Sequence, residues 1–320
     1  SDPLSRTDLP RDTLLSLVEA ERFRFAPGTM MEYANVGYDL LGFIIEQTSG
    51  QSYAEYLEQH LFRPAGMADS HYCDEQAVVD RGAQGYSWSP REGFRRREYF
   101  NHKWPHAAGS LCATAGDLVA WNQALHGGRL LPDSSYREMI TPGRLVDGTE
   151  LRYGMGIEVH EIEGHRVLRH AGAIFGFLSE VRYYPGDELI VVALQNTYFP
   201  RTPWALADSL SRLVLGAGEM IERSPYEGDL SEFTGRYVGP GGDGITDVRI
   251  IVEDGKLVAR GAGSDEEGDR LQHVAGLTWR TERELLPGTE DRFVGAGERI
   301  IRLRIDVGTG HYVLRRVEER

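Results

Sequence analysis

Basic residues are scarce in this sequence. Lysine and arginine together number 35 against 49 aspartates and glutamates, which gives a net charge of −14. Nucleic acid and anionic membrane surfaces repel so acidic a chain, so we expect neither as a partner. No apolar run is long enough to span a membrane, and no signal peptide opens the chain. Because the first residue is Ser1 rather than Met, we expect that an upstream piece was removed or left out.

Cysteine is rarer still, with two in the whole chain. Cys73 and Cys112 form no Cys-x-x-Cys metal pattern, and although they could pair, we expect buried or free thiols. His102 and His106 have a His-x-x-x-His spacing, but Pro105 disfavours the shared helix face that a metal site needs. We therefore expect neither a metal nor an organic cofactor.

The remaining composition is that of an ordinary globular protein, with 41% hydrophobic and 26% charged residues. At 320 residues, the length suggests two domains. Helical periodicity and capping residues predict helices at about 9–22, 36–50, 52–62, 114–127 and 202–216. Alternating patterns predict strands at 153–159, 166–169, 178–184 and 189–195. Antiparallel strands backed by a C-terminal helix and preceded by a helical insertion indicate an α+β fold.

The pattern changes again near residues 221–229. From Phe233 onwards, short strand-like runs alternate with Gly- and Asp-rich turns, which predicts a small all-β domain, a barrel or a sandwich. We therefore divide the chain into a first domain over 1–220 and an accessory β domain over 229–320. We expect the accessory domain to lie over the cleft of the first.

The stretch from Phe25 to Gly42 places Tyr33 and Asn35 just before a predicted helix. A tyrosine acts as a general base or proton relay when neighbouring cations lower its pKa. An asparagine offers a donor and an acceptor to an amide or ester. Local physics alone favours an ordinary helix entry, with a surface tyrosine and an asparagine N-cap.

The wider sequence context changes this interpretation. The run Tyr33-Ala-Asn-Val-Gly-Tyr-Asp-Leu-Leu-Gly, then Ser49-Gly50 and Leu-Phe-Arg-Pro-Ala-Gly-Met at 61–67, resembles the serine β-lactamase and penicillin-binding-protein superfamily. The closest branch is the one of class C β-lactamases, D-aminopeptidases and esterases. The resemblance implies a β-lactamase/transpeptidase-like fold and a serine hydrolase acting on a small-molecule or peptide substrate. It suggests a periplasmic or secreted bacterial protein, although a cytoplasmic location stays open.

A second run, Arg169 to Phe177, resembles the third motif of this superfamily: Lys or His, a small residue, then Gly. A lone histidine on a strand is more often structural, but the resemblance implies that His170 takes the cationic or donor position facing Tyr33. It also implies that Gly172 leaves room for substrate and that the Ala173 backbone N–H is an oxyanion donor. Ala171 stands where true β-lactamases often carry a hydroxyl residue, which favours an ester or peptide substrate.

The first motif of the superfamily, Ser-x-x-Lys, carries the nucleophile and its base partner, and it is absent. The two lysines are Lys103 and Lys256, and the residues three positions before them are Phe100 and Glu253. Ser110 has no Gly-x-Ser-x-Gly context and no lysine three residues on, so we interpret it as a structural turn residue.

Three explanations stay open, and the first is favoured. The chain is the C-terminal portion of a serine hydrolase that acts on an ester, amide, peptide or β-lactam through an acyl-enzyme. An upstream segment or second chain then supplies Ser-x-x-Lys, and the isolated chain is inactive. In the second explanation the chain is a non-catalytic binding or regulatory protein. In the third, Ser1 is an N-terminal nucleophile with its α-amine as base.

Overall fold

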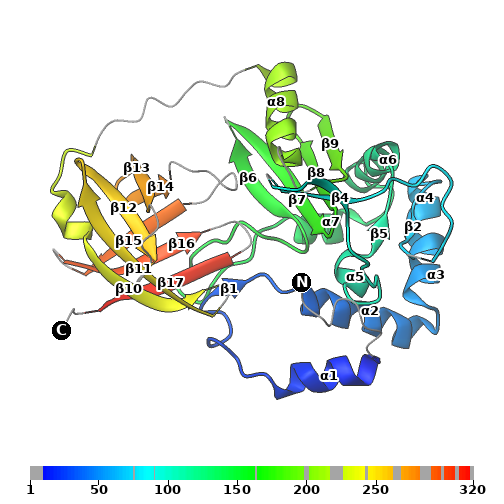
Figure 1. Cartoon of the computed structure of the whole chain (residues 1–320), viewed down its shortest axis with the longest axis horizontal. Coiled ribbons are helices and arrows are strands. Elements are labelled where there is room, and N and C mark those ends of the chain that lie inside the picture. The colour runs from blue at the N-terminus through cyan, green and yellow to red at the C-terminus, as the bar shows by residue number, and fades with distance from the viewer. Residues whose placement is uncertain are drawn as a thin grey trace.

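A four-stranded sheet covered by helices and a closed β-barrel lie side by side in the computed structural model of the chain (Figure 1). The structure describes residues 10–320 except 75, 90, 163, 198–201, 217–225, 242–243, 262–267, 282–289, 297–298, 307–309 and 318–320. The prediction of an α+β architecture followed by an all-β region is confirmed. None of the described helices is long and apolar enough to cross a membrane.

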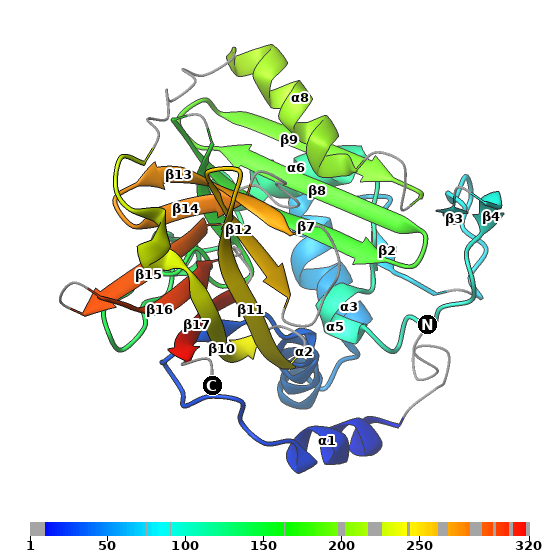
Figure 2. The same ribbon diagram turned by 60° about the vertical axis from the view of Figure 1, so that its left-hand side comes forward.

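The four-stranded sheet has the order β6-β7-β8-β9, and all neighbours are antiparallel. Its strands are β6 (Glu158–Ile162), β7 (His165–Ile174), β8 (Phe177–Tyr184) and β9 (Leu189–Gln195). Helix α8 (Pro203–Leu215) packs on one face, where its Ala207 meets Val167, Tyr184 and Val191 in a buried cluster. Since successive side chains of a strand point to opposite faces and Val167 faces α8, His170 lies on the other face. Figure 2 shows that face turned towards the helical part of the chain.

The helical part surrounds a small core of Leu57, Phe62, Ala65, Met67 and Ala124. Its described helices are α1 (Arg11–Ala20), α2 (Asn35–Ser49), α3 (Tyr53–Leu57), α4 (Arg63–Ala65), α5 (His106–Gly109), α6 (Ala115–His126) and α7 (Asp133–Met139). A π-helical turn, Glu58–Phe62, joins α3 to α4. Between these helices, the chain forms the strand pair β2 (His71–Tyr72) with β5 (Leu111–Cys112) and the hairpin β3 (Tyr86–Ser89) with β4 (Gly93–Arg96).

The observed helix ends agree with the predicted ones where a capping residue lies at the end of the helix. Gly50 ends α2 in the left-handed region, at φ 71°. Ser52 and Glu55 form the predicted capping box at the start of α3. The Thr114 hydroxyl accepts the Asp117 N–H at the start of α6.

The boundaries that differ from the prediction include the start of one strand and the end of one helix. The strand expected at 153–159 begins only at Glu158, because Gly156 lies at φ 77° and interrupts the extended backbone. The helix expected to end at about Phe62 continues through a π-helical turn and α4 to Ala65; Pro64 lies in the first turn of α4, where a proline is tolerated, and the predicted Gly66 ends the helix at φ 80°.

The C-terminal strands form an antiparallel barrel, which decides between the predicted barrel and sandwich. The strands follow one another in chain order, and β17 pairs with both β10 and β16 to close the ring. They are β10 (Gly235–Gly241), β11 (Gly244–Glu253), β12 (Lys256–Gly261), β13 (Asp269–Ala275), β14 (Thr278–Thr281), β15 (Glu290–Ala296), β16 (Arg299–Asp306) and β17 (Gly310–Val317). Buried side chains such as Phe233, Tyr237 and Trp279 fill the interior. Most of the predicted boundary at 221–229 lies outside the described residues, so the division into two domains stays a prediction.

A short strand, β1 (Met31–Glu32), attaches the barrel to the first part of the chain. Met31 pairs with His311 and Glu32 with Gly310 of β17, and Figure 1 shows β1 beside β17. The Arg304 side chain on β16 reaches Asp147 at 2.5 Å. The barrel is thus joined to the residues that immediately precede Tyr33, whereas its expected position over the cleft stays a prediction.

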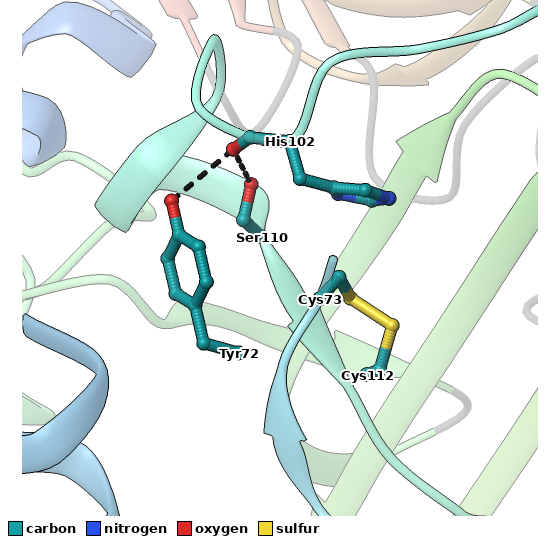
Figure 3. Close-up of a disulfide and its surroundings, with 5 residues drawn as sticks. All are labelled: Tyr72, Cys73, His102, Ser110 and Cys112. Carbon is teal, nitrogen blue, oxygen red and sulfur yellow. Dashed lines mark hydrogen bonds between the residues drawn. A yellow bond between two sulfur atoms is a disulfide. The ribbon is translucent and has the colours of Figure 1, made fainter. Parts of the chain in front are cut away.

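Cys73 and Cys112 form a disulfide, so the expectation of two free or buried thiols is wrong. Strands β2 and β5 pair His71 with Cys112, which brings the two cysteines together across 39 positions of sequence. Ser110 lies next to this bridge and is fully buried, and its hydroxyl donates to the His102 carbonyl (Figure 3). This burial supports the interpretation of Ser110 as a structural residue.

Removing the disulfide is expected to destabilise the protein by about 2–4 kcal/mol, because the bridge restricts a long loop in the unfolded chain. The double variant Cys73→Ala/Cys112→Ala therefore unfolds at lower denaturant than the wild type in guanidinium titrations followed by circular dichroism. Wild type treated with a reductant is the matched control and moves to the same midpoint. An unchanged midpoint in both samples would show that the bridge does not form in solution.

Candidate active site

A tight turn sets the approach to Tyr33. The Thr29 N–H donates to the Ala26 carbonyl at 3.1 Å, with Pro27 and Gly28 between them and Gly28 at φ 78°. This is the arrangement of a type II turn, which needs a glycine at its third position. Strand β1 follows the turn and delivers Tyr33 directly before the start of α2.

His170 lies on β7, which is one residue longer at its start and five residues longer at its end than the predicted strand at 166–169. The β6 pairing stops at Arg169, so from His170 to Ile174 the only described strand beside β7 is β8. The backbone groups on the other side of this segment therefore face no described strand. Such an edge can bind an extended ligand through main-chain hydrogen bonds.

The structure brings Tyr33 and His170 together from distant parts of the chain. Their ring centroids are 6.1 Å apart. A third ring, Tyr153, lies 6.1 Å from Tyr33 and 5.8 Å from His170, edge-on to both. The Tyr153 hydroxyl is 2.7 Å from His170 Nε2. The sequence led us to expect that His170 would face Tyr33, whereas the hydroxyl that contacts its ring is that of Tyr153.

The other candidate residues flank this cluster. Asn35 is the first residue of α2 and is exposed, so it is not the N-cap that local physics suggested; Ala34 takes that position. Gly172 faces Ser179 on β8, and a Cβ placed on Gly172 would lie 2.4 Å from the Ser179 hydroxyl oxygen. The space left by this glycine thus holds a hydroxyl group. Ala173 follows on the same strand and is exposed.

Tyr33 is electrostatically unsuited to be a base in this chain as it stands. Burial raises the pKa of its hydroxyl, and Tyr38, Glu158 and Asp39 raise it further. The buried Asp39 accepts the Ala108 N–H, and burial raises the pKa of this carboxyl to about 6. A general base needs the opposite influence, a nearby cation that lowers the pKa.

Comparison with known proteins identifies the family to which the residues of this cluster belong. The sequence pattern of the Beta-lactamase family matches residues 1–215, which include Tyr33, Asn35, His170, Gly172 and Ala173. The chain belongs to the Beta-lactamase family. The predicted superfamily is therefore confirmed, while the roles of the individual residues stay predictions.

Relatives agree with this placement. A D-aminopeptidase of Gluconobacter oxydans (strain 621H) is 32% identical over 173 residues, which are 54% of this chain and 33% of the relative. The solved structure of SurE matches 95% of this chain and 72% of its own, with a TM-score of 0.61 and 22% identity. A penicillin-binding protein from Bacillus halodurans matches 66% of each chain, with a TM-score of 0.58 and 25% identity. These likenesses confirm the predicted β-lactamase/transpeptidase-like fold.

The chain spans between a third and a half of the length of the curated D-aminopeptidases that it matches. The activity and substrates of the whole protein are therefore matters for proposal.

Sequence reasoning missed Tyr153 and Tyr38, which complete the cluster in this member of the Beta-lactamase family. Tyr153 was assigned to a strand, and Tyr38 to the apolar helix. The available signal was Gly154-Met155-Gly156, because two glycines directly after an aromatic residue mark a break in a strand and a close approach of the backbone.

A loop closed by the disulfide packs against the turn between β7 and β8. Arg97 lies over the Phe177 ring at 5.6 Å, and Phe100 packs edge-on against Phe175 at 5.3 Å. Phe175 and Phe177 flank the β7–β8 turn just beyond Ala173. These contacts hold Arg97 and Phe100 of the loop against the β7–β8 turn. No cluster of metal-ligand side chains occurs in the part of the chain that the structure describes.

Proposed function

We propose that this chain is the proton-relay and substrate-binding portion of a serine hydrolase of the D-aminopeptidase and esterase type. The observation that carries the proposal is the meeting of Tyr33 on the α2 approach with His170 on the exposed part of β7. Membership of the Beta-lactamase family supports it, as do relatives named D-aminopeptidase and D-amino acid amidase. The substrate class that fits these names is a peptide or amide with an N-terminal D-amino acid.

The proposed reaction is acyl transfer. A serine of a Ser-x-x-Lys motif, supplied by a segment outside this chain, attacks the substrate carbonyl. Tyr33 with the lysine takes the serine proton and passes it to the leaving amine as the C–N bond breaks, and water then hydrolyses the acyl-enzyme. Asn35 holds the acyl-side amide. The Ala173 N–H helps to stabilise the oxyanion, a contribution of about 2.7–4 kcal/mol in comparable hydrolases.

Ala171 favours a substrate without a carboxylate, because it offers no hydroxyl to bind one. The polar groups near it are His170 on the same strand and the hydroxyl of Ser179 on β8, across from Gly172. The disulfide supports an exported protein, because disulfides form and persist in oxidising compartments.

Two observations favour the alternative, a non-catalytic binding protein. The pKa of Tyr33 is raised, and no lysine of this chain lies in a Ser-x-x-Lys motif. A binding protein would keep the aromatic cluster as a docking surface and would not need a base. The alternative predicts that the protein with its upstream segment binds a peptide but reacts with no acylating probe.

The decisive test compares the 320-residue chain with the protein that includes the upstream Ser-x-x-Lys segment. We expect the isolated chain neither to hydrolyse p-nitrophenyl esters or nitrocefin nor to label with a fluorophosphonate. The longer protein should label and should hydrolyse a D-alanine p-nitroanilide, and replacing the motif serine by alanine should abolish both. Strong labelling of the isolated chain would overturn the proposal and return attention to Ser1 or Ser110.

A further inference from the structure

The contact between Tyr153 and His170 has a geometry that suggests more than packing. The Tyr153 side chain is buried, with 8% of the residue exposed, and its hydroxyl oxygen lies 2.7 Å from His170 Nε2. A buried tyrosine hydroxyl needs a hydrogen-bond partner, and the imidazole supplies one.

The other ring nitrogen fixes the direction of this hydrogen bond. His170 Nδ1 lies 2.6 Å from the Ala171 carbonyl oxygen, and a carbonyl can only accept. Nδ1 therefore carries a proton, so Nε2 accepts from the Tyr153 hydroxyl when the imidazole is neutral. Tyr38 on α2 also hydrogen-bonds with Tyr153. Burial raises the pKa of both tyrosines, and this hydrogen bond opposes the rise at Tyr38 and adds to it at Tyr153.

We propose that Tyr153 is a positioning residue: together with Tyr38 it forms a hydrogen-bonded bridge that fixes His170 and ties α2 to β7. At the His170 end of the bridge, the Tyr153 hydroxyl donates to Nε2 and Nδ1 donates to the Ala171 carbonyl. The start of α2 follows Tyr33 directly, and β7 carries the candidate oxyanion donor. The bridge therefore sets the distance between the two walls of the site. Its catalytic consequence rests on the proposed function, whereas its existence does not.

The surroundings of the bridge support this role. Gly156 lies at φ 77°, and a Cβ at this position would be 3.1 Å from the Tyr38 hydroxyl, so the glycine leaves room for the bridge. Burial raises the pKa of both Tyr38 and Tyr153, which keeps their hydroxyls protonated and able to donate. Tyr33 and Glu158 are the other ionisable groups that act on Tyr153, and both favour its neutral form.

The test is nitrogen NMR of the protein labelled with ¹⁵N-histidine, recorded at alkaline pH. In Tyr153→Phe, the His170 Nε2 resonance is expected to move towards the position of an imine nitrogen without a hydrogen bond. The matched control is Tyr136→Phe. The Tyr136 hydroxyl lies 2.7 Å from His126 Nδ1, so it forms a separate tyrosine–histidine pair that shares no residue with Tyr153 and His170. That variant should move the His126 resonances and leave those of His170 in place. Unchanged His170 resonances in a folded Tyr153→Phe protein overturn the bridge.

A second measurement separates this inference from the proposed function. In the protein with its Ser-x-x-Lys segment, Tyr153→Phe is expected to lower kcat roughly 10–100-fold, the usual scale for slight misplacement of a reacting group. A smaller change is expected in KM. If the His170 resonance moves but kcat does not, Tyr153 is not a positioning residue. If the wild-type protein is itself inert, the proposed function fails and the NMR result alone decides whether the bridge exists.

Discussion

Replacing Tyr33 by phenylalanine, in a protein that carries the proposed upstream Ser-x-x-Lys segment, is expected to lower kcat by about 10²–10⁴-fold. This is the usual contribution of a positioned general acid or base. The substitution removes one oxygen atom and keeps the ring that packs against Tyr153 and His170. Steady-state kinetics with a D-amino-acid amide measures the effect.

The same substitution should leave the melting temperature within about 1 °C of the wild type, because no buried hydrogen bond is lost. Among the described residues, none hydrogen-bonds to the Tyr33 hydroxyl. Tyr56→Phe is the matched control: it removes the hydroxyl of a half-buried tyrosine that packs on His60, away from the site. Full activity of Tyr33→Phe would mean that Tyr33 has only a structural role.

The electrostatics of Tyr33 explain why this experiment requires the longer protein. In the present chain, burial and the nearby Tyr38, Glu158 and Asp39 all raise the pKa of Tyr33, so its hydroxyl stays protonated at neutral pH. The lysine of Ser-x-x-Lys would bring the cation that reverses this shift. We therefore expect the pH at which Tyr33 loses its proton to fall when the upstream segment is present.

Features that a few neighbouring residues determine could be predicted from the sequence. The end of α2 at Gly50, the capping box of Ser52 and Glu55, and the cap at Thr114 each depend on contacts within four residues. The Tyr33 and His170 motifs could be recognised because each is a short continuous run. Their meeting followed from the resemblance, since nothing in either run indicates which distant residue it will contact.

Features that depend on tertiary contacts could not be predicted. The Cys73–Cys112 bridge requires β2 and β5 to pair, and both strands have only two residues and little alternation. Tyr153 belongs to the site only because the backbone turns at Gly156 and directs its ring towards His170. The raised pKa of Tyr33 likewise depends on burial and on charges brought near by folding, so the sequence could not exclude a lowered value.

The strand that carries His170 is held from behind by a buried network of charges. On the α8 face of the sheet, Glu180 accepts two hydrogen bonds from Arg169 and one from Arg182, each at 2.7 Å. Arg169 also donates to Glu158 at 2.6 Å, and Arg182 to Asp208 at 2.6 Å. Except for Asp208, these side chains are at most 5% exposed. Burial alone would lower the pKa of Arg169, but Glu180 and Glu158 hold it above its ordinary value.

Replacing Glu180 by glutamine is expected to destabilise the protein by about 3–5 kcal/mol, because it leaves two buried guanidinium groups short of negative charge. Guanidinium denaturation measures the loss. Glu253→Gln is the matched control: Glu253 pairs with Arg260 at 2.8 Å, but the two side chains are 41% and 36% exposed, so we expect a change of about 0–1 kcal/mol. Equal effects of the two substitutions would contradict the structural role of the network.

Since successive side chains of a strand point to opposite faces, Arg169 anchors β7 directly behind His170. The Glu180 variant should therefore also disturb the His170 resonances, even though Glu180 lies on the far side of the sheet from the site.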